Sequence, residues 1–167
     1  GHSGVLGSAE TDEQTLTGTI TAVNDRPAIM LTSTTLSNVD VDIELAGGII
    51  SVADVDSGTS SVTVTLGIST GRLSIDTSSP GISASGNGTS ANDMEVTGSV
   101  GNVNTALRTL RVIVPPGEFM SSTDINIAVN DNGHTGSGGA LDDTATLTFT
   151  HDTANDAPSV SAAASSR

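Results

Sequence analysis

Cysteine, lysine, tryptophan and tyrosine are all absent from the 167 residues of this chain. Without cysteine there is no disulfide, no thiolate metal site and no cysteine nucleophile. Without lysine the chain can form neither a Schiff base nor a lysine–asparagine isopeptide bond. Sugar-binding modules commonly stack pyranose rings on tryptophan or tyrosine, and the only aromatic residues here are Phe119 and Phe149. A sugar groove with walls of tryptophan or tyrosine is therefore excluded.

Positive charge is also scarce. Five basic residues, all of them arginine, stand against 19 acidic residues, which gives a net charge of -14 at neutral pH. No basic face can form to meet phosphates, so nucleic acid and anionic membrane surfaces are excluded as partners. Long apolar runs are missing too, and we expect neither a signal peptide nor membrane insertion. The partner that this charge favours is a cation.

The chain does contain an internal sequence repeat, which we call the echo. The segment TLTGTITAVNDRPA at 15–28 returns as TLTFTHDTANDAPS at 146–159, with seven of fourteen positions identical at an offset of 131 residues. Chance would give about one match. The echo predicts a cut from a tandem array: an expression scar plus the last strand of a preceding repeat at 1–23, one repeat at 24–154, and a linker to the next repeat at 155–167. Without its parent sheet, the leftover strand should be mobile or pair on an exposed edge.

Between the two echoes, Val, Ile, Leu and Thr alternate with a period of two, which predicts β-strands. The expected strands are 28–33, 41–45, 48–53, 61–68, 72–75, 93–97, 110–114, 124–130 and 144–150. A hairpin around Gly71 should join 61–68 to 72–75, and 78–92, rich in Ser, Gly and Asn, should be a mobile loop. The only helical candidate is 102–110, capped by Asn102. This pattern predicts an all-β fold, an antiparallel Greek-key β-sandwich with one short helix.

Strand order predicts where the acidic side chains lie. In the simplest seven-strand sandwich, the chain enters at the pole where the loops after the second and sixth strands open. Asp54 and Asp56 follow the second strand and Asp131 follows the sixth, so they should meet Asn24 and Asp25 of the entering linker. The opposite pole, where the second linker leaves, should gather another set: Asp40, Asp42 with Glu44, Asp124, Asn155 and Asp156.

Both poles are predicted calcium sites. Calcium takes six to eight oxygen ligands from Asp, Glu, Asn and backbone carbonyls. Each pole offers only part of such a set, so a neighbouring repeat would supply the remainder. The simpler interpretation is that these acids solvate loops and cap turns, as Asp and Asn commonly do. The convergence of three separate segments favours calcium at the entering pole.

Six segments keep a definite order and spacing along the chain: AVNDRPA at 22–28, ISVADVDSG at 50–58, NVNTALRTLRV at 102–112, PPGEFMSSTD at 115–124, VNDNGHTGSGG at 129–139 and TANDAP at 153–158. Together they resemble the cadherin-like tandem repeats of large bacterial surface adhesins of the RTX type. The resemblance covers nearly all of 24–158. It implies an extracellular, immunoglobulin-like β-sandwich on a bacterial cell surface, with calcium at the junctions between repeats.

The resemblance also implies particular ligands. In cadherins the linker Asn and Asp, an Asp-x-Asp after the second strand and an Asp after the sixth coordinate calcium. The matching positions here are Asn24, Asp25, Asp54, Asp56 and Asp131. The other pole departs from the pattern, because Asp40 and Asp42 stand where bacterial relatives show Glu-Asp, and only Asp124 lies near the place of the cadherin Asp-Arg-Glu.

Catalysis is not expected. His134 lies in a glycine-rich loop and His151 at a strand end, and neither has a nucleophile elbow or an oxyanion glycine motif beside it. The predicted function is a calcium-binding structural or adhesive repeat, whose linkers flex until calcium neutralises the junction carboxylates. Its partners would be neighbouring repeats, and like repeats or surface glycans of another cell. Two alternatives stay open: a calcium-dependent carbohydrate-binding module on the same fold, and a spacer without a specific metal.

Overall fold

The computed structural model describes residues 13–39, 42–45, 48–88, 93–113, 122–134 and 136–151. These residues form an all-β fold with one short helix, which confirms the predicted class. The strands are β1 (Ala28–Leu31), β2 (Thr35–Val39), β3 (Asp42–Glu44), β4 (Ile50–Ala53), β5 (Ser61–Ile68), β6 (Arg72–Ser74), β7 (Ser83–Ser85), β8 (Asp93–Ser99), β9 (Arg111–Ile113), β10 (Ser122–Asn130) and β11 (Asp142–His151). The helix α1 is Val100–Leu107.

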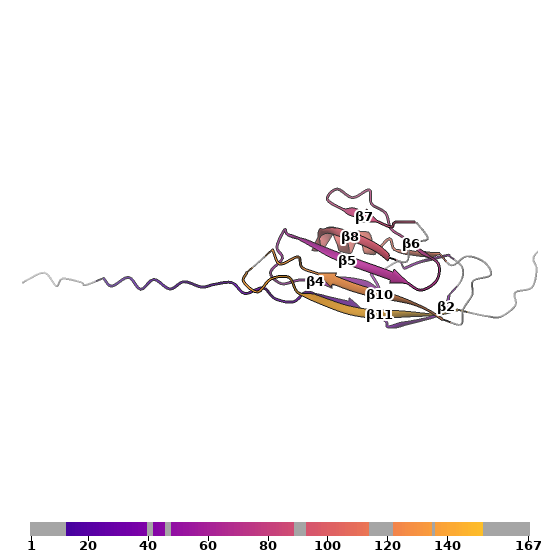
Figure 1. Cartoon of the computed structure of the whole chain (residues 1–167), viewed down its shortest axis with the longest axis horizontal. Coiled ribbons are helices and arrows are strands. Elements are labelled where there is room, and N and C mark those ends of the chain that lie inside the picture. Colours follow the sequence, from indigo (N-terminus) through magenta and orange to yellow (C-terminus); the bar gives the residue numbers. More distant parts are fainter. Residues whose placement is uncertain are drawn as a thin grey trace, which may run out of the picture.

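Three sheets build the sandwich (Figure 1). The largest has the strand order β2-β11-β10-β5-β8-β7, and the smaller ones are β1-β4 and β3-β9-β6. One face of the large sheet is buried against the two small sheets and α1, so the core lies between these layers. The helix contacts β4, β5 and β8. The sandwich therefore closes with a helix packed among its strands.

The period-two alternation of the sequence becomes the burial pattern of the core. Along β5, every second side chain is buried, and the residues between them are half-buried. The same alternation runs along β10, whose large apolar side chains are buried. Among the described residues, the largest fully buried side chain is that of Phe149 on β11. The buried apolar residues of β5, β10 and β11 are Val62, Val64, Leu66, Ile68, Ile125, Ile127, Val129, Leu147 and Phe149.

The predicted hairpin around Gly71 is wrong. Strand β5 pairs with β10 and β8 in the large sheet, whereas β6 pairs with β9 in a different sheet. Gly71 has a φ of +96°, a conformation that glycine adopts without strain. The turn that the sequence signals is real, but it passes the chain from one layer of the sandwich to the other.

Two strands were missed, and one pair is not antiparallel as predicted. After β1 pairs with β4, the chain crosses to the other layer, where β2 runs parallel to β11. The large sheet is therefore mixed. The expected mobile loop at 78–92 contains β7, which pairs with β8. Both missed strands are short, and β7 carries no large apolar side chain, so alternation gave no signal for it.

Helix α1 begins earlier than predicted. Its N-cap is Ser99, whose hydroxyl accepts a hydrogen bond from the amide of Asn102, so Asn102 lies inside the first turn. The helix packs against the core through Val103, Ala106 and Leu107, which are all buried. The serine hydroxyl accepts from the third helical amide, as N-cap side chains do.

Two asparagine side chains take the place of a neighbouring strand. The amide of Asn104 on α1 accepts from Val52 N at 2.8 Å and donates to Val52 O at 2.9 Å. Asn87 accepts from Ile75 N at 2.9 Å and donates to Ile75 O at 3.0 Å. Each amide pairs both backbone groups of a residue at a sheet margin. The pair with Val52 fixes the helix to β4, the strand that leads into the loop of Asp54 and Asp56.

Candidate functional site

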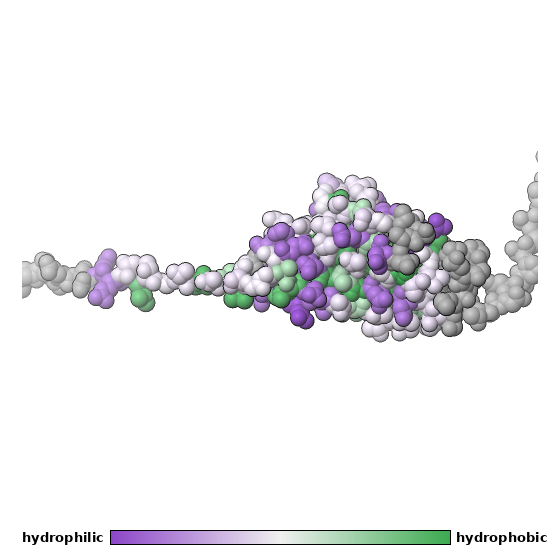
Figure 2. All heavy atoms as spheres, in the orientation of Figure 1, coloured by the Kyte–Doolittle hydropathy of each residue, from purple (hydrophilic) through white to green (hydrophobic). Residues whose placement is uncertain are grey.

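The chain reaches the sandwich at Asn24. Residues 13–22 have no assigned strand or helix and are exposed, and Figure 1 shows this segment extending away from the body. Its apolar side chains Leu16 and Ile20 are each 97% exposed, and Figure 2 shows apolar spheres along the tail. At the offset of 131 residues, Leu16 corresponds to Leu147, which is fully buried in β11. One residue of the tail therefore matches a core position of β11, whereas Gly18 stands at the position of Phe149; the proposed division into repeats stays a prediction.

The entering linker and the loop after β4 meet at one pole of the sandwich. The backbone N–H of Asp25 donates to Oδ2 of Asp56 at 2.9 Å. Asp56 N and Ser57 N both donate to Oδ1 of Asp54, at 3.2 and 3.1 Å, so the Asp54 carboxylate shapes its own loop. Three of the predicted ligands thus lie in one hydrogen-bonded group, built from segments about 30 residues apart in the chain.

The linker also meets the loop after β10. The side-chain amide of Asn24 donates to Oδ2 of Asp131 at 2.6 Å and to the carbonyl of Gly139 at 2.8 Å. Asn24 and Asp131 are both buried, with 5% and 3% of their surface exposed. The structure therefore brings Asn24, Asp25, Asp54, Asp56 and Asp131 to the same pole, as strand order predicts.

Asp54 and Asp56 lie unfavourably close for two carboxylates. Burial raises the pKa of Asp54 above its ordinary value, and the negative charge of the neighbouring Asp56 carboxylate raises it further. In the described part of the chain, Oδ2 of Asp54 is buried and has no hydrogen-bond donor. A buried carboxylate oxygen without a donor is costly. A cation bound there would neutralise the repulsion between the two carboxylates and would contact the oxygen that has no donor.

Asp131 has the opposite environment. Burial alone would raise the pKa of Asp131, but hydrogen bonds from Leu141 N, Gly133 N and the Asn24 amide outweigh it and lower the pKa below its ordinary value. Oδ1 accepts from Gly133 N at 2.9 Å and from Leu141 N at 2.8 Å, and Oδ2 accepts from Asn24. Three donors already surround this carboxylate. Its contacts are those of a residue that holds loop and linker together.

The side chains at this pole offer the type of ligand atom that calcium binds, but too few of them to complete a site. All the side chains that converge there carry oxygen, which is the ligand atom that calcium prefers. Among the residues that the structure describes, no group of three or more His, Cys, Asp or Glu side chains is arranged to hold a metal ion. A cation at Asp54 and Asp56 would therefore need further oxygens, from backbone carbonyls, water or a neighbouring module.

The opposite pole is described only in part. Asp42 lies in β3, opposite Ile113 of β9. Asp124 lies near the start of β10 and is exposed; its Oδ1 accepts from the Thr148 hydroxyl at 2.7 Å, which ties it to β11. The remaining predicted ligands of this pole, Asp40, Asn155 and Asp156, lie outside the described residues.

Sequence reasoning missed the backbone groups that complete the entering pole. Ser137 forms an isolated parallel bridge with Val23, and the Gly139 carbonyl accepts from Asn24. Ser57, which follows Asp56, is buried and hydrogen-bonded to Asp54. The only signal in the sequence was the glycine-rich run 133–139, which predicts a flexible tip more readily than a binding surface.

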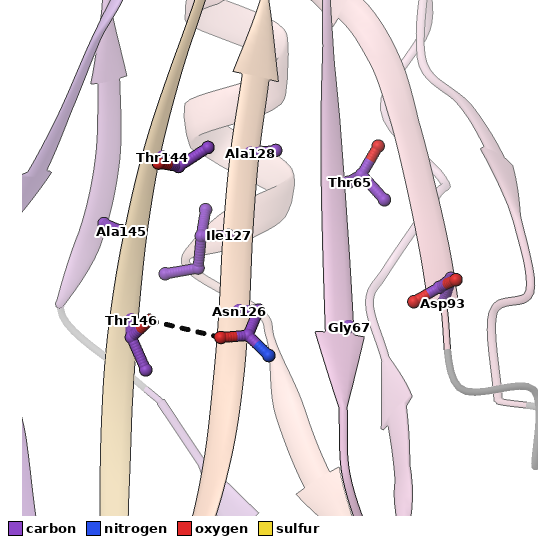
Figure 3. Close-up of a pocket in the computed structure, with 9 residues that line it drawn as sticks. All are labelled: Thr65, Gly67, Asp93, Asn126, Ile127, Ala128, Thr144, Ala145 and Thr146. Atoms are coloured by element: carbon purple, nitrogen blue, oxygen red, sulfur yellow. Dashed lines mark hydrogen bonds between the residues drawn. The ribbon is translucent and has the colours of Figure 1, made fainter.

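A shallow hollow of about 630 Å³ lies on the outer face of the large sheet, and none of its lining residues is a predicted ligand (Figure 3). Its floor and rim are made of small polar and apolar groups from β5, β8, β10 and β11: Thr65, Gly67, Asp93, Asn126, Ile127, Ala128, Thr144, Ala145 and Thr146. The side-chain Oδ1 of Asn126 accepts from the Thr146 hydroxyl at 3.1 Å. The lining offers hydrogen-bonding groups to a sugar but no aromatic face.

Comparisons with known proteins give no indication of the function of this chain. Neither the family models, nor the curated proteins, nor the solved structures contain a match to this chain. Within the described residues, the structure has no helix with the length and apolar character that a membrane span requires. Family membership therefore remains a resemblance, and function must be argued from the geometry of the entering pole.

Proposed function

We propose that this chain is a calcium-binding structural repeat of a long extracellular bacterial adhesin. The observation that carries the proposal is the group formed by Asp25, Asp54 and Asp56, in which Oδ2 of Asp54 is buried and has no donor among the described residues. Two neighbouring carboxylates, one with a raised pKa, create an electrostatic cost that a divalent cation would relieve. The net charge of -14 favours a cation over any anionic partner.

The role we propose is mechanical. In the tandem array that we propose, each repeated Asn-Asp-x-Pro segment would mark a junction with one such pole. Calcium would join Asp54 and Asp56 to oxygens of the preceding module, and the array would extend and stiffen. The partners of this chain would then be the neighbouring repeats. The whole array would serve in adhesion to another cell.

Calorimetric titration with calcium and thermal unfolding with calcium or chelator test this function. Extracellular calcium modules bind with a Kd on the order of 0.1–1 mM. With a Kd of ~0.1 mM, 10 mM calcium would stabilise the fold by about 2.7 kcal/mol. That corresponds to a rise in Tm of about 5–10 °C for a domain of this size. An unchanged Tm together with no binding heat would leave a spacer without a specific metal as the better description.

A further inference from the structure

The glycine-rich loop after β10 holds the entering linker by backbone hydrogen bonds. Asn24 N donates to Ser137 O at 3.0 Å, and Ser137 N donates to Ala22 O at 2.9 Å. These two bonds flank Val23, which forms a parallel bridge with Ser137. The linker is therefore paired like a strand, although the pairing is only one residue long.

The side chain of Asn24 completes this contact. Its amide reaches two acceptors at once, the Gly139 carbonyl and Oδ2 of Asp131. An apolar residue at this position would leave the buried Asp131 oxygen without its donor, and an ionised aspartate would repel it. The contact therefore selects asparagine.

The loop is also shaped for a second backbone. Gly136 has a φ of +75°, and a Cβ at this position would lie 2.6 Å from both the N of Asn24 and the C of Val23. Only glycine leaves room for the linker here. We call the surface made by residues 136–139 and the Asp131 side chain the linker groove.

We propose that the linker groove is a binding surface for an extended segment that carries asparagine, and that the linker stays bound in it when no cation is present. The four contacts that hold the linker in the groove are hydrogen bonds within the protein, so none of these four needs a metal. The occupant is the linker of this chain, and the matching Asn155 would occupy the same groove in a following module. This extension to Asn155 rests on the proposed tandem function, whereas the binding of Asn24 does not.

This proposal changes what calcium would do at the junction. The linker from Ala22 onward is fixed by the groove, and of the described residues those at 13–21, which are exposed, are left to be ordered. Calcium at Asp54 and Asp56 would then act on the preceding module and not on the attachment of the linker.

Amide hydrogen exchange on the full chain tests the groove. In chelator, we expect the amides of Asn24 and Ser137 to exchange at least about tenfold more slowly than those of Ile20 and Thr21, because only the first pair is hydrogen-bonded. Calcium should change these two rates by less than about threefold. Exchange of Asn24 in chelator as fast as that of Ile20 would overturn the proposal.

A pair of glycine variants distinguishes loss of the linker contact from the backbone strain that any alanine at a positive φ causes. Gly136→Ala and Gly88→Ala both place an alanine at a positive φ, +75° and +69°, but a Cβ at Gly88 meets nothing within 4 Å. Only Gly136→Ala should bring the exchange of Asn24 to the rate of the tail, while the core amide of Val64 stays protected in both. If Gly136→Ala unfolds the chain, Asn24→Ala provides the same readout. Unchanged exchange at Ser137 in Asn24→Ala would contradict the proposal.

The outcomes for calcium and for the groove are independent. A Tm that does not respond to calcium, with slow exchange of Asn24 in chelator, would refute the calcium function and support the groove. A Tm that responds to calcium, with exchange of Asn24 that becomes slow only when calcium is added, would support the function and refute the groove.

Discussion

The side-chain amide of Asn24 donates to Oδ2 of Asp131 at 2.6 Å, across 107 residues of sequence. This bond joins the entering linker to the loop between the two longest strands, and both residues are buried. It sets the place and direction from which the chain enters the sandwich. The acidic group of Asp25, Asp54 and Asp56 is assembled next to it.

Replacement of Asn24 should destabilise the fold even in chelator. In Asn24→Ala, the buried Asp131 oxygen loses its donor, which costs about 1–3 kcal/mol. Asn24→Asp should cost at least as much at neutral pH, because two carboxylates would then face each other. Below pH ~4 the aspartate variant should recover relative to Asn24→Ala, since a protonated carboxyl can donate. Urea unfolding of both variants across pH measures this, and an aspartate variant that stays equally weak in acid would contradict it.

Asp54→Asn should show separately how the Asp54 carboxylate affects stability without calcium and whether it binds calcium. In chelator, we expect the Tm to rise, because the variant removes an ionised carboxylate whose pKa is raised and keeps Oδ1 for Asp56 N and Ser57 N. With calcium, most of the gain in Tm should be lost, since a cation ligand is gone. Asp76→Asn is the matched control, because Asp76 is exposed and hydrogen-bonded to Ser78 N. An Asp54→Asn variant with the full calcium response would refute the predicted site.

Acid should weaken the entering pole through Asp131. Its folded pKa lies below the ordinary value, so the ionised form stabilises the fold at pH above ~4, and this contribution is lost as the pH falls through the folded pKa. Asp131→Asn places an amide donor where N–H groups already point, and it should cost about 1–3 kcal/mol at neutral pH. The difference from the parent protein should shrink in acid. Denaturation curves at pH 7 and in acid measure it, and a constant difference would contradict this assignment.

The bond between Asn104 and Val52 should contribute to stability far from the pole. Asn104→Ala leaves Val52 N and O without these partners, and we expect a loss of about 1–3 kcal/mol in the free energy of unfolding. Asn126→Ala is the control, because the bond between Asn126 and Thr146 lies on the exposed face of the sheet, and it should change stability by less than about 0.5 kcal/mol. Equal losses in chemical denaturation would show that the amide of Asn104 has no special role.

The strands could be predicted because apolar and polar residues alternate along each of them. Each inward residue of β5 and β10 is followed by a less buried one, and a period of two signals this without knowledge of the partner strand. Pairing was not predictable in the same way. The turn at Gly71 could close a hairpin or cross between layers, and only the packing of Leu73 and Val112 in the second layer decides for the crossing.

The sequence by itself determined the all-β class, the scarcity of positive charge and the placement of acids after β4 and β10. Those features follow from residue types and short periods along the chain. Tertiary structure alone decided that Asp131 accepts three hydrogen bonds, whereas Oδ2 of Asp54 is buried without a donor among the described residues. Two aspartates that look alike in sequence differ because Asn24, 107 residues away, and Leu141 both donate to Asp131, while Asp54 is buried beside the Asp56 carboxylate. Hydrogen bonding and burial depend on those neighbours, and only folding brings them together.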